Sequence, residues 1–371
     1  MARFGDLVSR VNTKEDRFNT DKNFYVGGEH IESNELLVHA KGMIEGSTIG
    51  PMFYFGFKAG DILFVTRNPH LRKAAMVEFD GICSEKTLVL ATNDESILLQ
   101  SYLAIVMQSD DFWEYCEDNK SGGVNYFINW STLEEYEFDL PPIDEQKKIA
   151  SQIWAAYRLK EAYKSLLTAT EEMVKSQFIE MFGNPTQFAK KKVHNLFCLS
   201  MGKTPSRANS HYWDQDGYKW ASISDMGAWE KYSGETAEHI SMEAVSCTGI
   251  KPVPKNTIIM SFKLSIGRTC ITTSDLYTNE AIMAFLPLTD AFNLDYLHFY
   301  IANYNWSNGA KQAVKGATLN KESIGNALFI LPPQGLQEEF ASIVRQADKS
   351  KFELKKAIEA IDQVIKSLIN G

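Results

Sequence analysis

Two long stretches of the chain carry apolar residues at the spacing of a helix that packs lengthwise against a partner. The first stretch has apolar or small residues at Ile149, Ile153, Ala156, Tyr163, Leu167, Thr170 and Val174, and the second has them at Phe340, Val344, Ala347, Leu354, Ile358, Ile361 and Ile365. Alternating steps of three and four residues place such side chains on one face of an α-helix. Each stretch therefore predicts a long amphipathic helix whose apolar stripe needs a partner.

The second stripe repeats the first at an offset of 191 positions, as from Ile149 to Phe340. The matching features are the Leu-Pro-Pro triplets at 140–142 and 331–333, Gln146 and Gln337, and the lysines that interrupt the stripes, Lys160 and Lys351. Two unrelated helices have no reason to share a polar interruption at the same turn. The pattern therefore indicates an internal duplication, in which each helix is the natural partner of the other copy.

A globular segment precedes each helix. The run at 59–64 resembles the run at 255–260, and both are rich in residues that favour strands. We predict a mixed α/β (α+β) fold: two pseudo-repeated globular domains separated by two long antiparallel coiled-coil helices. The predicted segments are a first globular domain at 1–140, a central helix at 141–185, a second globular domain at 186–331 and a C-terminal helix at 332–371.

Composition indicates a globular protein of a reducing compartment. The chain has 371 residues, of which 44% are hydrophobic, enough for two or three domains with cores of their own. The longest apolar run, Ala281 to Leu288, is far shorter than the roughly 18 residues of a membrane span, and the N-terminus has no apolar signal segment. Five cysteines without a C-x-x-C pair argue against a disulfide framework or structural zinc. We expect a cytoplasmic protein with no membrane partner.

The net charge of -9 argues at first against nucleic acid, because binding to phosphates needs a basic surface. The acidic residues, however, are concentrated in one part of the chain. Residues 1–140 carry 12 basic and 23 acidic residues, whereas residues 186–335 carry 14 and 12. The second globular segment is therefore compatible with a phosphate-binding face, despite the acidic average.

Motifs of common enzymes are missing from the sequence. Gly202-Lys203-Thr204 resembles the end of a phosphate loop, but Phe197 stands where that loop requires glycine. The sequence contains no G-x-G-x-x-G, H-E-x-x-H or G-x-S-x-G motif. The Pro-Pro pairs lack the flanking polar residue and aromatic residue that amino-methyltransferases use. The sequence thus predicts neither a catalytic centre nor a metal site on this chain.

Taken together, the repeated segments resemble the specificity (S) subunit of type I restriction–modification systems. The segments that carry the resemblance are the two Leu-Pro-Pro-(x)3-Gln entries, Glu180 to Pro185, Gly202 to Arg207, Tyr212-Trp213, Trp220 to Met226 and Lys315 to Asn320. The resemblance covers essentially the whole chain, and its specificity comes from the duplicated order. The first globular domain departs from the pattern: it has no Gly-x-Thr-Pro opening, and Tyr25 to Ile31 stands in place of Trp220 to Met226.

The resemblance implies a DNA-reading subunit without catalytic activity. Each globular domain would be a target-recognition domain that reads one half of a bipartite site in double-stranded DNA. The two helices would set the unread spacer and dock two methyltransferase (M) subunits. S-adenosylmethionine would be bound by the M subunits, and ATP and Mg by additional restriction (R) subunits, so this chain would need no cofactor.

Candidate DNA contacts are polar and basic residues near predicted turns. They are Lys203, Thr204, Ser206, Arg207, Arg268 and Lys315 in the second domain, and Arg67, Arg72 and Asn129 in the first. Arg72 and Arg268 equally suit a structural role as partners of Glu85 and Glu280. Two other functions stay open: an enzyme with an unfamiliar site, and a non-catalytic coiled-coil scaffold or interaction protein. Methyltransferase activity of the isolated chain would support the enzyme, and a sequence-selected DNA motif would exclude the scaffold.

Overall fold

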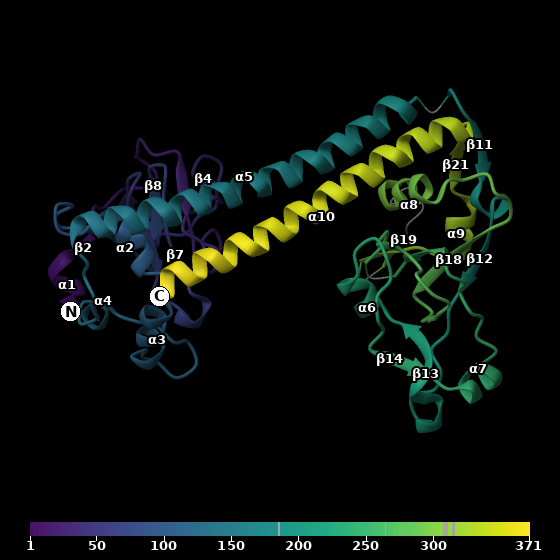
Figure 1. The fold of residues 1–371 in the computed structure, drawn as a ribbon, viewed down its shortest axis with the longest axis horizontal. Coiled ribbons are helices and arrows are strands. Elements are labelled where there is room, and N and C mark those ends of the chain that lie inside the picture. The colour runs from purple at the N-terminus through teal and green to yellow at the C-terminus, as the bar shows by residue number, and fades with distance from the viewer. Residues whose placement is uncertain (185, 264, 307–310, 314–315) are drawn as a thin grey trace. The chain divides into compact units, whose positions relative to one another are not determined.

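The computed structural model of the chain describes residues 1–184, 186–263, 265–306, 311–313 and 316–371. The chain divides into two compact units (Figure 1). Unit 1 comprises Met1–Leu166 and Glu353–Gly371, and unit 2 comprises Leu167–Phe352. Each unit thus contains one globular part, called head 1 (residues 1–140) or head 2 (residues 186–331), together with a part of each long helix.

Head 1 contains two four-stranded sheets. Its strands are β1 (Ala2–Arg3), β2 (Val8–Val11), β3 (Phe24–Val26), β4 (Gly42–Met43), β5 (Phe53–Phe57), β6 (Ile62–Val65), β7 (Ala74–Met76), β8 (Gly81–Ser84), β9 (Thr87–Thr92) and β10 (Glu137–Phe138). Its helices are α1 (Phe4–Leu7), the 3-10 helix η1 (Pro69–Leu71), α2 (Gln100–Val106), α3 (Asp110–Asp118) and α4 (Trp130–Leu133). The sheet orders are β2-β9-β6-β7 and β4-β3-β8-β5, and the short pair β1-β10 stands apart.

Head 2 contains a four-stranded and a three-stranded sheet. Its strands are β11 (Ala189–Lys192), β12 (Phe197–Met201), β13 (Trp213–Ala221), β14 (Glu238–Ile240), β15 (Ile258–Ser261), β16 (Thr269–Ile271), β17 (Tyr277–Thr278), β18 (Ile282–Pro287), β19 (Lys311–Ala313), β20 (Gly316–Thr318) and β21 (Leu328–Leu331). Its helices are η2 (Val193–Asn195), η3 (Ser210–Tyr212), α6 (Ile223–Ala228), α7 (Met242–Thr248), α8 (Leu294–Asn303) and α9 (Lys321–Asn326). The sheet orders are β12-β18-β15-β16 and β14-β13-β17, with pairs β11-β21 and β19-β20 beside them.

The two heads share one strand topology, which confirms the predicted duplication. The antiparallel sheet β2-β9-β6-β7 corresponds to β12-β18-β15-β16, strand for strand. Ile62 pairs with Met76 in head 1, and Ile258 pairs with Ile271 in head 2. In the second sheet of each head, one strand has an antiparallel and a parallel neighbour. In head 1, β3 pairs antiparallel with β4 and parallel with β8, and in head 2, β13 pairs antiparallel with β14 and parallel with β17. The sequence repeat is therefore a repeat of the fold.

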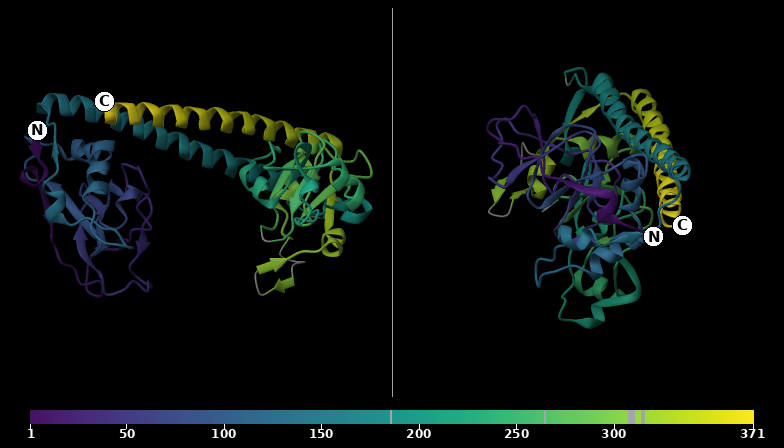
Figure 2. Two further views of the ribbon diagram at one scale, coloured as in Figure 1. Left: turned by 90° about the horizontal axis from the view of Figure 1, so that it is seen from below. Right: turned by 90° about the vertical axis from the view of Figure 1, so that its left-hand side faces the viewer.

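The two long helices are α5 (Ile143–Phe182) and α10 (Gln334–Asn370), and each begins directly after its Pro-Pro pair. In unit 1 the first part of α5 runs beside the end of α10 (Figures 1 and 2), where Ile153 and Ile365 belong to one buried cluster with side chains of head 1. In unit 2, Phe178 and Phe182 of α5 pack against Phe340 of α10, with ring centroids 5.3 and 5.6 Å apart. In both units the helices are antiparallel partners, as the stripes predicted.

The lysines that interrupt the stripes have different surroundings. Lys160 is only 6% exposed, and its ammonium group lies 3.1 Å from Glu35 and 2.8 Å from Asp362. Lys351 is more exposed and pairs with Asp348 on its own helix. Lys160 is therefore a buried ionic contact, because α5 packs on head 1 as well as on α10.

Two equivalent glutamines join each long helix to its head. Gln146 is fully buried: its Nε2 donates to the carbonyls of Ile97 (2.8 Å) and Pro141 (2.9 Å), and its Oε1 accepts from the amide of Leu99 (3.0 Å). Gln337 is also fully buried and repeats the arrangement, with donation to the carbonyls of Ala291 (3.0 Å) and Pro332 (2.9 Å) and acceptance from the amide of Asn293 (2.9 Å). Each glutamine thus satisfies three backbone groups at the helix entry.

No helix among the described residues is long and apolar enough to cross a membrane.

Candidate nucleic-acid interface

Four segments of head 1, far apart in the sequence, are joined by backbone hydrogen bonds. The amide of Ile128 donates to the carbonyl of Thr66 (3.0 Å), and the amide of Asn68 donates to the carbonyl of Tyr126 (2.9 Å). The amide of Glu85 donates to the carbonyl of Met52, also over 2.9 Å. The amide of Thr66 donates to the carbonyl of Lys86 (2.9 Å), and this bond links the turn after β6 and the segment before α4 to the turn between β8 and β9 and the segment before β5.

A pocket of about 250 Å³ lies where these segments meet. It is lined by Arg10, Thr66, Arg67, Glu85, Lys86, Leu88, Phe127, Ile128, Asn129 and Trp130. Two of the three residues predicted in head 1, Arg67 and Asn129, therefore lie together. Arg10 was not predicted from the sequence, because a single arginine on a strand gives no local signal that a distant turn will approach it.

Hydrogen-bonding groups of the pocket are left available to a ligand. Within the described residues, the side chains of Arg10 and Arg67 form neither a hydrogen bond nor an ion pair, and each guanidinium lies over an aromatic ring: Arg10 over Phe55 at 5.1 Å and Arg67 over Phe127 at 5.6 Å from the ring centroid. Glu85 is paired with Lys86, and this hydrogen bond is the main reason that the pKa of Glu85 lies below its usual value. The pocket therefore keeps two guanidinium groups without a bonded carboxylate, and the charge of Arg67 is one of the smaller contributions to the lowered pKa of Glu85.

Asn129 differs from its equivalent in head 2 in the use of its side chain. Asn320, 191 positions later, caps α9: its side chain accepts a 2.7 Å hydrogen bond from the amide of Ser323. Asn129 precedes α4 in the same way, but its side chain makes no capping hydrogen bond and is exposed. The side-chain amide group of Asn129 is consequently free to donate one hydrogen bond and accept another. This is the pattern by which asparagine recognises the edge of an adenine.

Arg72, the third residue predicted in head 1, lies outside this pocket. It has a left-handed backbone (φ 49°) after η1, and its guanidinium pairs with Asp110 of α3 at 2.5 Å. The suggested partner Glu85 is therefore wrong, because the turn directs Arg72 toward α3. Arg72 lines another pocket, of about 580 Å³, with Lys160 and Asp362.

The Gly-Lys-Thr-Pro-Ser-Arg segment of head 2 is held by internal contacts. Gly202 leaves no room for a side chain, because a Cβ there would lie 1.9 Å from the carbonyl oxygen of Thr278. The ammonium group of Lys203 donates to the carbonyl of Thr248 (2.8 Å), and the hydroxyl of Thr204 donates to Glu280. The carbonyl of Ser206 accepts from the indole of Trp213 (3.3 Å), while its hydroxyl is exposed.

The predicted arginines of head 2 also have partners within the head. Arg207 pairs with Glu238 and lies 3.8 Å from the ring centroid of Trp213. Arg268 donates to the carbonyls of Gly227 and Trp229. The suggested pairing of Arg268 with Glu280 is wrong, because Arg268 bonds to these two carbonyls while Glu280 accepts from the hydroxyl of Thr204. Lys315 lies outside the described residues.

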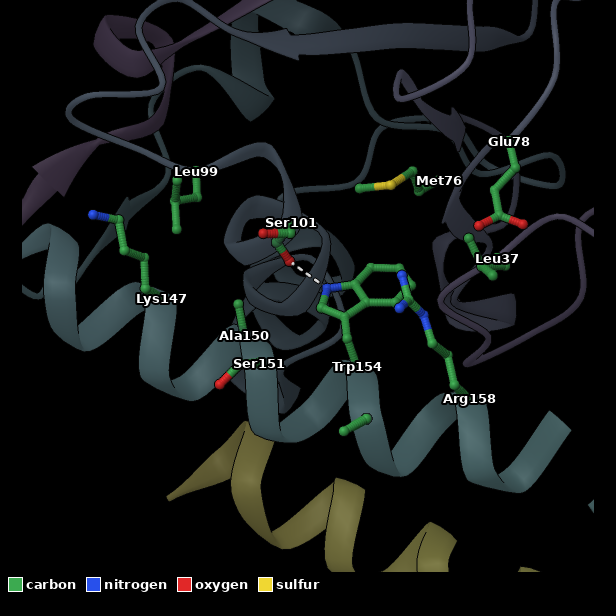
Figure 3. A pocket seen from close by; sticks show the side chains of 11 residues that line it. Leu37, Met76, Glu78, Leu99, Ser101, Lys147, Ala150, Ser151, Trp154 and Arg158 are labelled. Atoms are coloured by element: carbon green, nitrogen blue, oxygen red, sulfur yellow. Dashed lines mark hydrogen bonds between the residues drawn. The ribbon is translucent and has the colours of Figure 1, made fainter. Parts of the chain in front are cut away.

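A second, more apolar pocket borders α5 in unit 1. Figure 3 shows the side chains of Trp154 and Arg158 extending from α5 toward Leu37, Met76 and Glu78 of head 1. The pocket measures about 480 Å³, and the indole of Trp154 donates to the carbonyl of Ser101 (3.0 Å) along its wall. Apolar walls with a polar rim are typical of surfaces that bind another protein's side chains.

Comparisons with known proteins agree with this geometry. The sequence profile of the type I restriction modification DNA specificity domain matches twice, over residues 9–165 and 185–363. The chain is 23% identical over 195 residues to the type I restriction enzyme HindI specificity subunit of Haemophilus influenzae, a match over 50% of this chain and 42% of that protein. It is likewise 23% identical over 191 residues to the MjaIX specificity subunit of Methanocaldococcus jannaschii, over 50% of this chain and 44% of that protein. The matched part thus spans less than half of either relative.

Solved structures show the same fold at low sequence identity. The S subunit of a type I restriction–modification system from M. genitalium is 13% identical and aligns over 99% of this chain and 94% of its own, with a TM-score of 0.60. A chain from a structural study of type I restriction–modification complex assembly and conformational transition aligns over 99% and 95%, with 16% identity and a TM-score of 0.61.

Proposed function

The chain belongs to the family of type I restriction–modification DNA specificity proteins, and from this premise we propose that it selects the DNA sequence on which a type I complex acts. The observation that carries the proposal is the duplication: the specificity domain matches twice, and each match covers most or all of one head and the beginning of the long helix that follows it. Two heads that share one topology but differ in their surface residues suit a bipartite DNA site, because each half of the site would be recognised by a different head.

We propose that the pocket with Arg10, Arg67 and Asn129 is the DNA-contacting centre of head 1. Arginine binds guanine edges or phosphates with two hydrogen bonds, and asparagine binds adenine in the same way. Phosphate contacts fix the position of the head, while base-edge contacts determine the sequence. In head 2, Ser206 has a free hydroxyl, and the exposed pair of Arg207 and Glu238 could exchange its carboxylate for a phosphate.

We further propose that catalysis belongs to partner subunits. M subunits would bind S-adenosylmethionine and methylate the DNA, and R subunits would use ATP and Mg, so this chain itself would need no cofactor. The two M subunits would dock along the long helices, and the complex would work in the cytoplasm. Support for docking comes from the apolar pocket beside α5 and from Leu159 of the same helix, whose side chain is 45% exposed.

The proposed function is tested by mapping methylated adenines in a host that expresses the chain together with its M subunit. We expect a bipartite motif, and replacement of head 2 by a related head should change one half of the motif and leave the other half unchanged. The purified chain alone should neither methylate DNA nor hydrolyse ATP. Methylation without a motif would favour the scaffold alternative, and a change in both halves would show that the heads do not read independently.

Loss of the free groups in head 1 should weaken DNA binding in two distinct ways. Asn129→Ala should reduce the discrimination between bases at one base pair by about 1–3 kcal/mol. Arg67→Ala, if it removes a phosphate contact, should weaken binding to DNA of every sequence alike and reduce the salt slope of binding by about one. The measurement is titration of labelled duplexes by the assembled complex at several salt concentrations. Lys58→Ala, an exposed position of head 1 outside the pocket, is the matched control and should change neither quantity.

A further inference from the structure

The two heads contact their helices through equivalent segments that differ in charge at one position, which is Leu36 in head 1 and Lys231 in head 2. In head 1 the segment lies between β3 and β4, where the carbonyl of Leu36 accepts from the amide of Met76 (2.9 Å). In head 2 the segment lies between β13 and β14, where the carbonyl of Lys231 accepts from the amide of Ile271 (2.8 Å). Met76 and Ile271 occupy the same place in their sheets, each opposite the first residue of the central strand. Lys231 therefore corresponds to Leu36, and Glu35 corresponds to Glu230.

In unit 1, Glu35 is bound by side chains of α5. Its carboxylate accepts from the hydroxyl of Tyr157 (2.8 Å) and from the ammonium groups of Lys160 (3.1 Å) and Lys164 (3.0 Å). Burial alone would raise the pKa of Glu35, but the charge of Lys160 and the bonds from Lys164 and Tyr157 lower it below its usual value. We call this cluster anchor 1, an acidic group of the head held by lysines of the helix.

In unit 2, Lys231 adds a cation where head 1 has Leu36. The ammonium group of Lys231 lies 2.6 Å from Asp295 of α8 and 2.8 Å from Asp348 of α10. Arg345, also on α10, contacts Asp295 at 3.1 Å. Burial by itself lowers the pKa of Lys231, but the hydrogen bonds to both aspartates outweigh it and raise the pKa above its usual value. We call this cluster anchor 2, a basic group of the head held by an aspartate of the helix.

The long helices differ at the position that decides which head fits. At the helix offset of 191, Asp348 of α10 corresponds to Tyr157 of α5, so α5 offers no carboxylate there. The lysines do not distinguish the two helices, because Lys351 and Lys355 of α10 stand at the positions of Lys160 and Lys164 of α5. The difference is Asp348, and a buried ionic group that loses its partner is strongly destabilising. Head 2 is therefore suited to α10 and unsuited to α5.

We propose that Lys231 and Asp348 form a complementary pair that selects head 2 for α10 and fixes its orientation on the helix. The inference rests on the proposed function, because the orientation of a head determines which bases it reaches. Both residues are positioning residues, without a DNA contact of their own. A foreign head inserted at 186–331 should accordingly dock only if it carries a cation at the place of Lys231.

The test is a charge-exchange series in the full chain, read by hydrogen exchange and by methylation mapping. Lys231→Glu places three carboxylates together, and Asp348→Lys places its new cation beside Lys231 and Lys351. Each single variant should speed amide exchange in α8 and β16 by roughly tenfold or more, with head 1 unchanged. In the complex with the M subunit, each should relax the half-site of head 2 alone. The double variant Lys231→Glu with Asp348→Lys should restore slow exchange and the motif.

Controls keep the outcomes separate. Lys349→Glu makes the same charge change as Lys231→Glu at an exposed position of α10 and should leave both readouts unchanged. Should Lys231→Glu yield no folded protein, Lys231→Met, which removes the charge and keeps the chain length, should give an intermediate exchange rate. Unchanged exchange in the single variants, or a double variant no better than the singles, would overturn the proposal. If the chain without substitutions gave methylation without a motif, the proposed function would be wrong. The hydrogen-exchange comparison would still test the pairing of Lys231 with Asp348.

Discussion

Lengthening both long helices by seven residues is expected to move the two methylated half-sites apart by about three base pairs. Seven residues add about 10 Å of helix, and one base pair occupies about 3.4 Å along DNA. The insertions belong after Leu166 in α5 and after Phe352 in α10, at the boundary between the units. There they leave Lys160 opposite Asp362 in unit 1 and Phe178 opposite Phe340 in unit 2.

The length of the insertion provides the control for this result. Four residues add about 6 Å and rotate the apolar stripe by only about 40°, so a longer spacer is expected again. Two residues rotate the stripe by about 200° and expose it, so that the complex should fail to assemble. The measurement is the methylated motif of each variant in a host that supplies the M subunit. An unaltered spacer after the seven-residue insertions would show that the helices do not set the distance between the half-sites.

Replacing Gln337 by leucine should destabilise unit 2 by about 2–4 kcal/mol, because the change leaves backbone groups of Ala291, Asn293 and Pro332 without their partner. Leucine has a similar volume, so the loss comes from hydrogen bonding rather than from a cavity. The expected observation is faster hydrogen exchange in head 2 and a lower unfolding temperature. Gln146→Leu should produce the same effect in head 1 only.

An exposed glutamine of the same helix serves as the matched control for the buried one. Gln363 lies on α10 with its side chain in solvent, and Gln363→Leu should change stability by no more than about 0.5 kcal/mol. Equal effects of Gln337→Leu and Gln363→Leu would mean that the three hydrogen bonds of Gln337 do not stabilise the helix entry.

Much of the architecture could be predicted because it depends on local patterns. The steps of three and four residues gave both long helices, since side-chain direction in a helix repeats with the turn. The Leu-Pro-Pro triplets marked where the helices begin, because proline is tolerated at a helix entry and disrupts a helix interior. Gln146 and Gln337 were recognisable as equivalent residues from the offset alone. What their side chains bind was not, since Ile97 and Ala291 lie more than forty residues away in sequence.

The candidate site was predicted less well, and the reason is physical. Arg207 and Arg268 looked available in the sequence, but Arg207 pairs with a residue 31 positions away and Arg268 with one 41 positions away. Free donors are found instead where Arg10, Arg67 and Asn129 come together from three parts of head 1. The sequence by itself determined the duplication, the helices and the family, because periodicity and repeats are properties of short segments. Only the tertiary structure decided which charges are neutralised, because an ion pair depends on the distance between side chains that folding brings together.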